Sequence, residues 1–339
     1  MRIAVIGAGA IGSVVAAYVT KSGQNVTLVG KPEQVNVISK RGLNVLGARG
    51  DEAFKIKMIP RLEQAHDLVI FTVKTQDLQN AIDTNRDFLK SGVLLSTQNG
   101  VQADNILKNN FAAERIISSI VMFGATYTKP GAVVFNFDGD WIIGRPFGTN
   151  DDNVKMTADA LQKAFSVVVV DDITGMKWLK LFVNFYNCIP AIVGKPMQEV
   201  FADLDFCRLS ILLLREGIEI IQAANIKLVS LPQFPVDRIV SLATMPIEQA
   251  SGIINKTLTT LSKEPLYGSI LQSILRKRTS EIEFINGEVV RLAQEMKWDA
   301  PLNRKIVEMV HKVESFKEFM KSEAVKSIFN LNKAKAYDA

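Results

Sequence analysis

Cysteine and histidine are scarce in this chain of 339 residues, which contains two of each. Neither Cys188 nor Cys207 has the neighbouring ligands of a metal site, and two cysteines do not make a disulfide framework. His66 and His311 lie among charged residues, so we expect both at the surface rather than on a metal. The sequence therefore predicts no metal centre.

Long hydrophobic runs are also missing. No apolar segment approaches the roughly 18–20 residues that a transmembrane helix needs. The apolar segment near the N-terminus is broken by glycines and lacks the cleavage site of a signal peptide. Hydrophobic residues make up 47% of the chain and charged residues 22%, as in ordinary globular proteins. We therefore expect a cytoplasmic protein with no membrane partner.

The third absence is a cluster of basic residues. The net charge is +5 and the isoelectric point is about 9.0, but basic residues are interspersed with acidic ones, as at Arg304, Lys305 and Glu308. A nucleic-acid surface needs clustered basic residues with interleaved aromatic ones. We expect no nucleic-acid partner, and a mild positive charge suits an anionic cofactor and a carboxylate substrate.

Glycine, by contrast, is concentrated near the N-terminus, where Gly7, Gly9 and Gly12 have the G-x-G-x-x-G spacing. The motif follows a predicted strand at 2–6 and opens a helical pattern. In dinucleotide-binding folds the three glycines allow a tight turn, close approach of a pyrophosphate and close helix packing, and the helix N-terminus faces the phosphates. Because both flanking elements are present, the sequence predicts a dinucleotide site. Its phosphate loop comprises Gly7, Ala8, Gly9, Ala10, Ile11 and Gly12.

Strands and helices alternate along the first half of the chain. The continuous apolar run at 68–73 is typical of a strand covered on both faces of a parallel sheet. Segments 133–137 and 141–143 resemble the two strands of a hairpin. Besides the strand before the glycine motif, strands are predicted at 25–29, 93–97, 116–121 and 166–170.

Beyond about residue 172 glycine becomes scarce, and apolar residues recur with the 3.6-residue period of helices. Continuous helices are predicted at 178–192 and 282–292, among others. The predicted fold class is therefore α/β: a Rossmann-type doubly wound sheet at 1–170, which binds NADP, followed by an all-helical domain at 171–325 for substrate and dimerisation. Apolar helix faces make a homodimer plausible.

The end of the second predicted strand bears on the choice of cofactor. NAD-binding units carry an Asp or Glu there for the ribose, whereas a basic residue accommodates the 2′-phosphate of NADP. This chain has Gly30 followed by Lys31. The pattern favours NADP(H), and Glu33, two residues further on, leaves NAD open.

A polar stripe marks the predicted helix that begins near residue 177. At 100° per residue, Lys180, Asn184 and Asn187 lie in one row, opposite a broad apolar face. Asparagine is a poor helix former, so two of them beside a lysine indicate a polar pocket more than a solvated face. Lys177 lies only about 60° from Lys180, so the period does not decide which lysine faces the pocket.

The ordered set of motifs resembles the ketopantoate reductase family (2-dehydropantoate 2-reductases) from residue 2 to about residue 315. The second predicted domain opens with K-W-x-K-L-x-x-N at 177–184. The other matching motifs are T-x-K at 72–74, Q-N-G at 98–100, P-G at 130–131, I-G-R at 143–145, S-I-L-Q at 269–272 and E-I-E-F-I-N-G at 281–287.

This resemblance implies reduction of 2-dehydropantoate to pantoate with NADPH, on the route to coenzyme A. Lys180 would donate the proton, because a positioned cation stabilises the alkoxide that develops during hydride transfer. Glu281 would pair with Lys180 or with the hydroxyl of the substrate and so tune the pKa of the lysine. Judged without the resemblance, Glu281 reads as a first-turn glutamate that stabilises a helix dipole.

The resemblance also implies the binding residues. Lys74 and Asn99 would contact the cofactor, and Asn99, Asn184 and Ser269 the substrate. The family often has a second asparagine where this chain has Cys188, and Asn187 on the same stripe could compensate as a substrate-binding residue.

A polar residue is also common in the family where this chain has Leu266. Both departures concern residues that would hold the substrate, so another small 2-oxo acid stays open as the substrate. A non-catalytic, dinucleotide-binding redox sensor is the alternative from another functional class.

Overall fold

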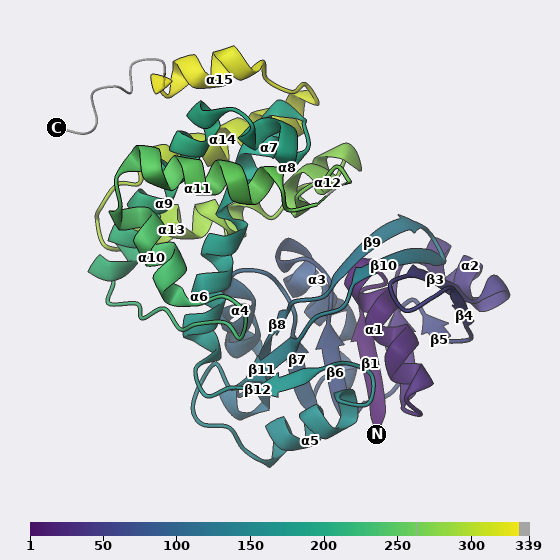
Figure 1. Cartoon of the computed structure of the whole chain (residues 1–339). Coiled ribbons are helices and arrows are strands. Elements are labelled where there is room, and N and C mark those ends of the chain that lie inside the picture. The colour runs from purple at the N-terminus through teal and green to yellow at the C-terminus, as the bar shows by residue number, and fades with distance from the viewer. Residues whose placement is uncertain (263, 332–339) are drawn as a thin grey trace. The chain divides into compact units, whose positions relative to one another are not determined.

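The computed structural model describes residues 1–262 and 264–331 (Figure 1). Its internal contacts divide the chain into two compact units, Met1–Thr174 and Gly175–Ala339. The first unit holds all the named strands of the described residues, and the second is built from helices.

An eight-stranded sheet forms the centre of the first unit, in the order β12-β11-β8-β7-β6-β1-β2-β5. All neighbouring strands run parallel except β8 and β11, which are antiparallel. The strands are β1 (Arg2–Ile6), β2 (Asn25–Val29), β5 (Lys57–Ile59), β6 (Leu68–Phe71), β7 (Val93–Ser96), β8 (Ile116–Val121), β11 (Trp141–Gly144) and β12 (Val167–Val169).

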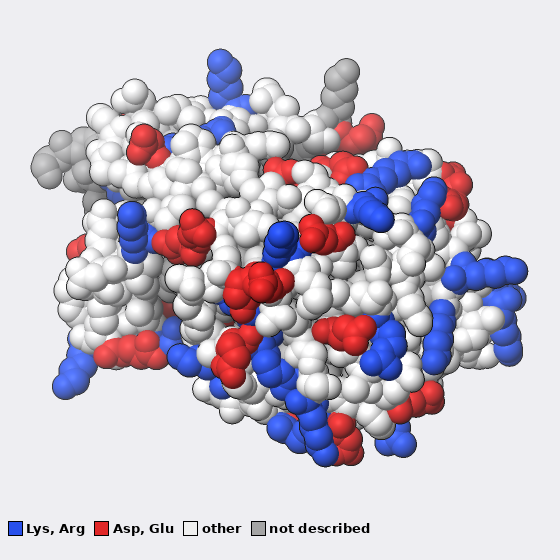
Figure 2. All heavy atoms as spheres, turned by 90° about the horizontal axis from the view of Figure 1, so that it is seen from below, with Lys and Arg blue, Asp and Glu red and all other residues white. Residues whose placement is uncertain are grey.

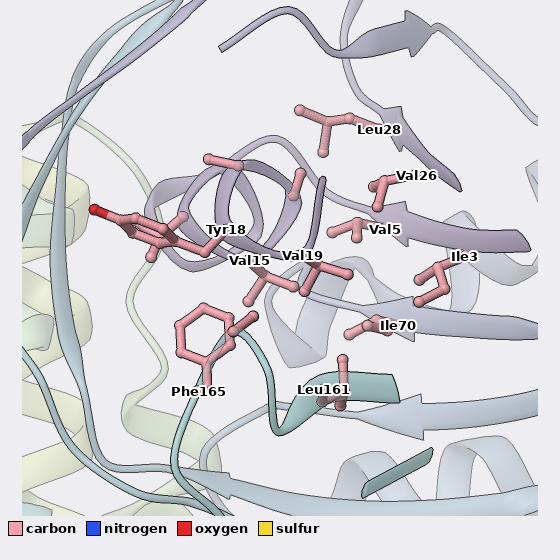
Figure 3. Packing of buried hydrophobic residues seen from close by; sticks show 14 of the residues in the cluster. Ile3, Val5, Val15, Tyr18, Val19, Val26, Leu28, Ile70, Leu161 and Phe165 are labelled. Carbon is pink, nitrogen blue, oxygen red and sulfur yellow. The ribbon is translucent and has the colours of Figure 1, made fainter. Parts of the chain in front are cut away.

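Helices cover both faces of this sheet, because its strands are apolar on both sides. In β1, Ile3 and Val5 join a core cluster with α1, whereas Ala4 and Ile6 join a second cluster with α3 and α4. Figure 3 shows Val15 and Val19 of α1 beside Ile3 and Val5. This arrangement confirms the predicted doubly wound sheet. The helices are α1 (Ala10–Lys21), α2 (Pro32–Arg41), α3 (Thr75–Asn85), α4 (Gln102–Asn110) and α5 (Asp152–Leu161), with short 3₁₀ turns η1 (Arg86–Phe88) and η2 (Ala113–Arg115).

A second, four-stranded sheet has the order β4-β3-β10-β9. Its strands are β3 (Leu43–Gly47), β4 (Glu52–Phe54), β9 (Gly124–Lys129) and β10 (Ala132–Phe137). The hairpin predicted between 133–137 and 141–143 is wrong, because β10 pairs with β9 and β3 while β11 pairs with β8 and β12. The reversal occurs earlier, at Pro130 and Gly131, where Gly131 adopts a φ of +77° that suits a tight turn. The segment around Gly139 instead carries the chain from one sheet to the other.

Helices make up the second unit, which confirms the predicted helical C-terminal region. The long helix α9 contacts α8, α10, α11, α13 and α14. The elements are α6 (Ile173–Asn184), η3 (Phe185–Asn187), α7 (Cys188–Val193), α8 (Met197–Phe201), α9 (Leu204–Ala223), α10 (Val236–Thr244), α11 (Ile247–Thr259), α12 (Ser269–Leu275), η4 (Ile282–Phe284), α13 (Asn286–Glu295), α14 (Pro301–Phe316) and α15 (Ser322–Ile328).

Two helices that the periodicity predicts as continuous are interrupted. The stretch 178–192 consists of α6, η3 and α7, and the stretch 282–292 consists of η4 and the start of α13. Pro190 explains the first break, because it has no N–H to donate to the carbonyl of Tyr186 and its ring crowds that carbonyl. In the second stretch the break falls at Ile285, whose φ of −118° and ψ of −90° are not helical.

His66 is buried, so the prediction that it lies at the surface is wrong. Its Nδ1 lies 3.0 Å from the carbonyl oxygen of Gln64, and burial lowers the pKa of the ring below its ordinary value. The carbonyl of His66 lies directly against Gly92, which shows how closely the neighbouring loop covers this segment. His311 keeps partial exposure beside two carboxylates.

The remaining compositional expectations concern charge, metals and membranes. Acidic side chains lie between the basic ones over the face seen in Figure 2. Among residues 1–262 and 264–331, no group of three or more His, Cys, Asp or Glu side chains could hold a metal ion. Within the same residues, every helix is too short or too polar to cross a bilayer.

Candidate functional site

The glycine-rich turn between β1 and α1 has the geometry that a dinucleotide requires. Gly7 adopts a φ of +119°, and a Cβ there would lie 2.7 Å from the backbone nitrogen of Val73. A Cβ on Gly12 would lie 1.9 Å from the carbonyl oxygen of Gly7. Gly9 precedes the first residue of α1, and a Cβ on it would meet no atom within 4 Å. Gly7 and Gly12 therefore serve packing, while Gly9 leaves open space where a pyrophosphate can approach the backbone.

Thr72 fixes this turn from the neighbouring strand. Its Oγ1 donates to the carbonyl oxygen of Gly7, at 2.7 Å, and lies 3.1 Å from the carbonyl oxygen of Ile6. The end of β6 is thereby attached to the end of β1. The first residue of the T-x-K motif is thus structural, and it keeps the phosphate loop in place.

A side chain at Gly30, which follows the end of β2, would crowd three neighbours. A Cβ at Gly30 would lie 2.6 Å from Cε of Met58, 2.7 Å from Cβ of Ala8 and 2.9 Å from Oε1 of Gln34. The ribose-binding carboxylate of NAD-binding units cannot occupy this position without displacing its neighbours. Lys31 follows, exposed, as the residue that precedes α2.

Lys74 and Asn99 follow the ends of two adjacent strands, β6 and β7. Lys74 precedes α3, and both residues are partly buried. Gln98 directly precedes Asn99, and its Nε2 donates to the carbonyl oxygens of Phe71, at 2.9 Å, and Val73, at 2.8 Å. Gln98 thus joins the two strand ends at the carboxyl edge of the sheet, where open α/β folds bind their ligands.

In the second unit, Lys180 and Asn184 lie one helical turn apart on α6. Both side chains are partly buried. Burial lowers the pKa of the Lys180 ammonium below its ordinary value, because removal from water disfavours the charged form. Lys177, the other candidate, is almost fully buried. Lys180 is therefore the more exposed of the two lysines.

Asn187 lies against the segment that leads into α12. It belongs to η3, is buried, and its Oδ1 lies within 2.4 Å of the place where a Cβ on Gly268 would be. A larger residue at 268 would push the side chain of Asn187 away from this position. The structure thereby brings Asn187 next to the start of α12, whose first residue is the exposed Ser269. Two of the predicted substrate-binding residues are therefore close together, although 82 positions separate them in the sequence.

The two departures from the family pattern have different outcomes. Cys188 is fully buried, and its Sγ donates to the carbonyl oxygen of Phe185 at 3.0 Å. Burial raises the pKa of this thiol to about 12. The Cys188 side chain therefore faces the core, and the effect of this departure on the choice of substrate stays a prediction. Leu266 is partly buried, and its backbone N–H donates to Oε1 of Gln198 at 3.0 Å.

Glu281 occupies a short segment that α14 holds on both sides. Glu281 is partly buried and immediately precedes the three-residue turn η4, so it does not lie in the first turn of an α-helix. The interpretation of Glu281 as a first-turn glutamate is therefore wrong. On one side, the backbone N–H of Ser280 donates to Oε1 of Glu314 at 2.7 Å. On the other, Oε1 of Glu283 lies 2.6 Å from Nε2 of His311, whose Nδ1 lies 3.0 Å from Oε2 of Glu314.

Two glutamines that the sequence analysis does not name, Gln34 and Gln98, hold backbone segments in place beside the predicted site residues. Gln98 is the first residue of the Q-N-G motif, and this position could have indicated its role. Gln34 stands at the third position of α2, after Pro32 at the first, and this is where a Gln or Glu side chain caps a helix N-terminus. Nothing in the sequence indicates the contact of Gln34 with the glycine loop.

Comparison with known proteins extends over both units. A family model described as ketopantoate reductase PanE/ApbA matches residues 3–146, and its C-terminal counterpart matches residues 172–314. A 2-dehydropantoate 2-reductase of Pyrococcus horikoshii is 30% identical over 309 residues, which cover 89% of this chain and 94% of the relative. One from Streptococcus pyogenes is 24% identical and covers 93% of this chain and 98% of the relative.

Solved structures agree on the fold. A PanE/ApbA family ketopantoate reductase from Ralstonia eutropha has a TM-score of 0.79 at 25% identity, covering 93% of this chain and 99% of the other. A D-mandelate dehydrogenase in complex with NADH and anilino(oxo)acetate has a TM-score of 0.81 at 21% identity, with the same coverage. Since the two family models together match far more than half of its residues, this chain belongs to the ketopantoate reductase family of oxidoreductases.

Proposed function

We propose that this protein reduces 2-dehydropantoate to pantoate with NADPH. The observation that carries the proposal is the partly exposed ammonium of Lys180, with its burial-lowered pKa, one turn from Asn184 in the K-W-x-K-L-x-x-N motif of the family. Such a group releases a proton more easily than an ordinary lysine while still stabilising negative charge.

Residues 1–170 hold the cofactor and residues 171–325 hold the substrate. Gly7, Gly9 and Gly12 form the turn for the pyrophosphate, which meets the backbone at Gly9. Lys31 meets the 2′-phosphate, since Gly30, after the end of β2, supplies no ribose-binding carboxylate. Lys74 and Asn99 contact the cofactor from the strand ends. NADH is the alternative, and NADH is the cofactor named for the D-mandelate dehydrogenase structure.

When bound, the dinucleotide would supply the hydride that adds to C2 of the oxo acid. The electron pair of the C2 carbonyl moves to its oxygen, which takes a proton from Nζ of Lys180, and the neutral amine regains a proton from water. Asn99, Asn184 and Asn187 orient the substrate, and Ser269 binds its carboxylate. Glu281 accepts a hydrogen bond from Lys180 or from the hydroxyl of the substrate and so tunes the pKa of the lysine.

A steady-state panel tests this proposal. We expect the largest kcat/KM for 2-dehydropantoate with NADPH, with slower turnover of 2-oxoisovalerate, which lacks the hydroxyl. Equal rates for these two acids would remove the specific assignment and leave a 2-oxo acid reductase. If every acid gave no oxidation of NADPH while the protein still bound the dinucleotide, the redox-sensor alternative would hold instead.

Leu266 favours a second candidate, a reductase of a more apolar 2-oxo acid. Its partly buried side chain stands three residues before Ser269, where the family tends to have a polar residue. An apolar lining at this point binds an alkyl or aryl group better than a hydroxyl. The same panel, extended to aromatic 2-oxo acids, separates the candidates.

A homodimer stays a prediction that light scattering of the purified protein can test.

A further inference from the structure

The side chain of Gln34 connects the two places where a 2′-phosphorylated dinucleotide would carry its phosphates. Its Nε2 donates to the carbonyl oxygen of Ala8 at 2.6 Å, inside the glycine loop. Its Oε1 accepts from the backbone N–H of Lys31 at 3.0 Å. A single buried amide therefore spans from the pyrophosphate turn to the residue proposed for the 2′-phosphate.

Further contacts hold this amide in one orientation. Nε2 also donates to Oη of Tyr127 on β9 at 3.1 Å, so both of its donor hydrogens have acceptors. Gln34 is 8% exposed, and in a buried setting loss of such bonds is costly. Its Oε1 also stands 2.9 Å from where a Cβ on Gly30 would be, and so fills part of the space that a ribose-binding carboxylate needs.

We propose that Gln34 is a positioning residue that fixes Lys31 at a set distance from the glycine loop and thereby gives the protein its preference for NADPH over NADH. The inference rests on the proposed NADPH specificity. It assigns that specificity to a residue that touches neither phosphate. Without the amide, the start of α2 loses its bond to Ala8, and Lys31 is held less firmly to the pyrophosphate turn, although the backbone bond from the N–H of Gly7 to the carbonyl oxygen of Val29 remains.

The decisive measurement is the ratio of the dissociation constants for NADH and NADPH, obtained by calorimetry on the full chain. Gln34→Met preserves the length of the side chain and removes all three hydrogen bonds. We expect this ratio to fall about tenfold, which is the effect of losing one charge-assisted hydrogen bond, here the one between Lys31 and the 2′-phosphate. Most of the change should come from weaker NADPH binding, and the KM for NADPH should rise while kcat stays nearly constant.

Two comparisons make this effect specific. Lys31→Ala should abolish the preference, and Gln34→Met added to Lys31→Ala should then change the ratio no further. Gln162→Met, an exposed glutamine of the same unit that bonds Asp159, serves as the matched control and should leave both constants unchanged. A preference that survives Gln34→Met but disappears in Lys31→Ala would overturn the role of Gln34 and leave the NADPH assignment intact.

Equal binding of both dinucleotides by the unmodified protein, unaffected by Lys31→Ala, would overturn the proposed cofactor specificity itself. If Gln34→Met lowers the thermal midpoint of the free protein markedly, Tyr127→Phe takes its place, because it removes only the hydroxyl that Nε2 contacts. We expect a smaller drop in the same ratio there. An unchanged ratio in a folded Tyr127→Phe protein would then count against the inference.

Discussion

The glycine loop of the first unit and the polar segments of the second are held in place in different ways. Around the loop, side chains such as Thr72 and Gln98 bond to backbone carbonyls at the ends of adjacent parallel strands. In the helical unit, Asn187 and Glu281 depend on interruptions of helices and on contacts with elements far along the chain. The first geometry follows from a short sequence motif, and the second follows from tertiary packing.

The largest effect expected from this comparison is on the chemistry of Lys180. Lys180→Ala removes the proposed proton donor and should lower kcat by a factor of about 10²–10⁴, the usual contribution of a general acid. Dissociation constants for NADPH should stay unchanged, because the cofactor residues lie in the other unit. Lys256→Ala, which removes an exposed lysine of α11, is the control and should retain full activity. Undiminished turnover in Lys180→Ala would exclude the proposed role.

Within the glycine loop, two alanine substitutions should behave in opposite ways. Gly12→Ala places a Cβ 1.9 Å from the carbonyl oxygen of Gly7, so the backbone must shift, and we expect a loss of about 3 kcal/mol or more in the free energy of unfolding. Gly9→Ala meets no atom and should change that free energy by less than about 1 kcal/mol, while weakening dinucleotide binding. Urea unfolding and calorimetry on the two variants separate packing from binding. Equal stability of both would contradict the geometry.

In the helical unit, the neighbouring residues Asn187 and Cys188 offer a matched pair. Asn187→Ala should raise the KM for the oxo acid about tenfold through loss of a substrate hydrogen bond, with little change in the KM for NADPH. Cys188→Ala should leave both KM values unchanged and lower only stability, because its side chain is closed off in the core. An increase in the KM for the oxo acid in Cys188→Ala alone would restore the interpretation that position 188 lines the site.

These contrasts explain how much could be predicted from the sequence. The sheet, its doubly wound coverage and the glycine turn were predictable, because apolar strands and the G-x-G-x-x-G spacing are local patterns. The site residues themselves stay predictions, some from local patterns, such as Lys31 and the row that contains Lys180, and others, such as Ser269, from family motifs. Pro190 could have indicated the break in the helix at 185–187, since proline withholds a backbone donor. The pairing of β10 with β3 and the burial of His66 could not be predicted, because they depend on residues distant in the sequence.

The smallest expected effect concerns the contacts that α14 makes beside Glu281. Burial lowers the pKa of His311, but hydrogen bonds to Glu283 and Glu314 outweigh it, so the pKa lies above its ordinary value of 6.5 in the folded protein. A raised pKa stabilises the fold below the unfolded pKa, and this stabilisation is lost as the pH rises through the folded one. Because His311 is partly exposed, we expect a contribution below about 1 kcal/mol.

His311→Gln removes this titration, so the difference in unfolding free energy between the variant and the parent protein should be larger at pH 6 than at pH 8.5. Urea unfolding at both pH values measures it. His66→Gln is the matched control with the opposite sign, because burial lowers the pKa of His66 and its contribution to stability therefore increases with pH. If His311 also positions Glu281 through Glu283 and Glu314, the same substitution should lower kcat at pH 6 more than it changes the KM for NADPH. A difference in unfolding free energy that grows with pH would show that the two carboxylates do not hold the protonated ring.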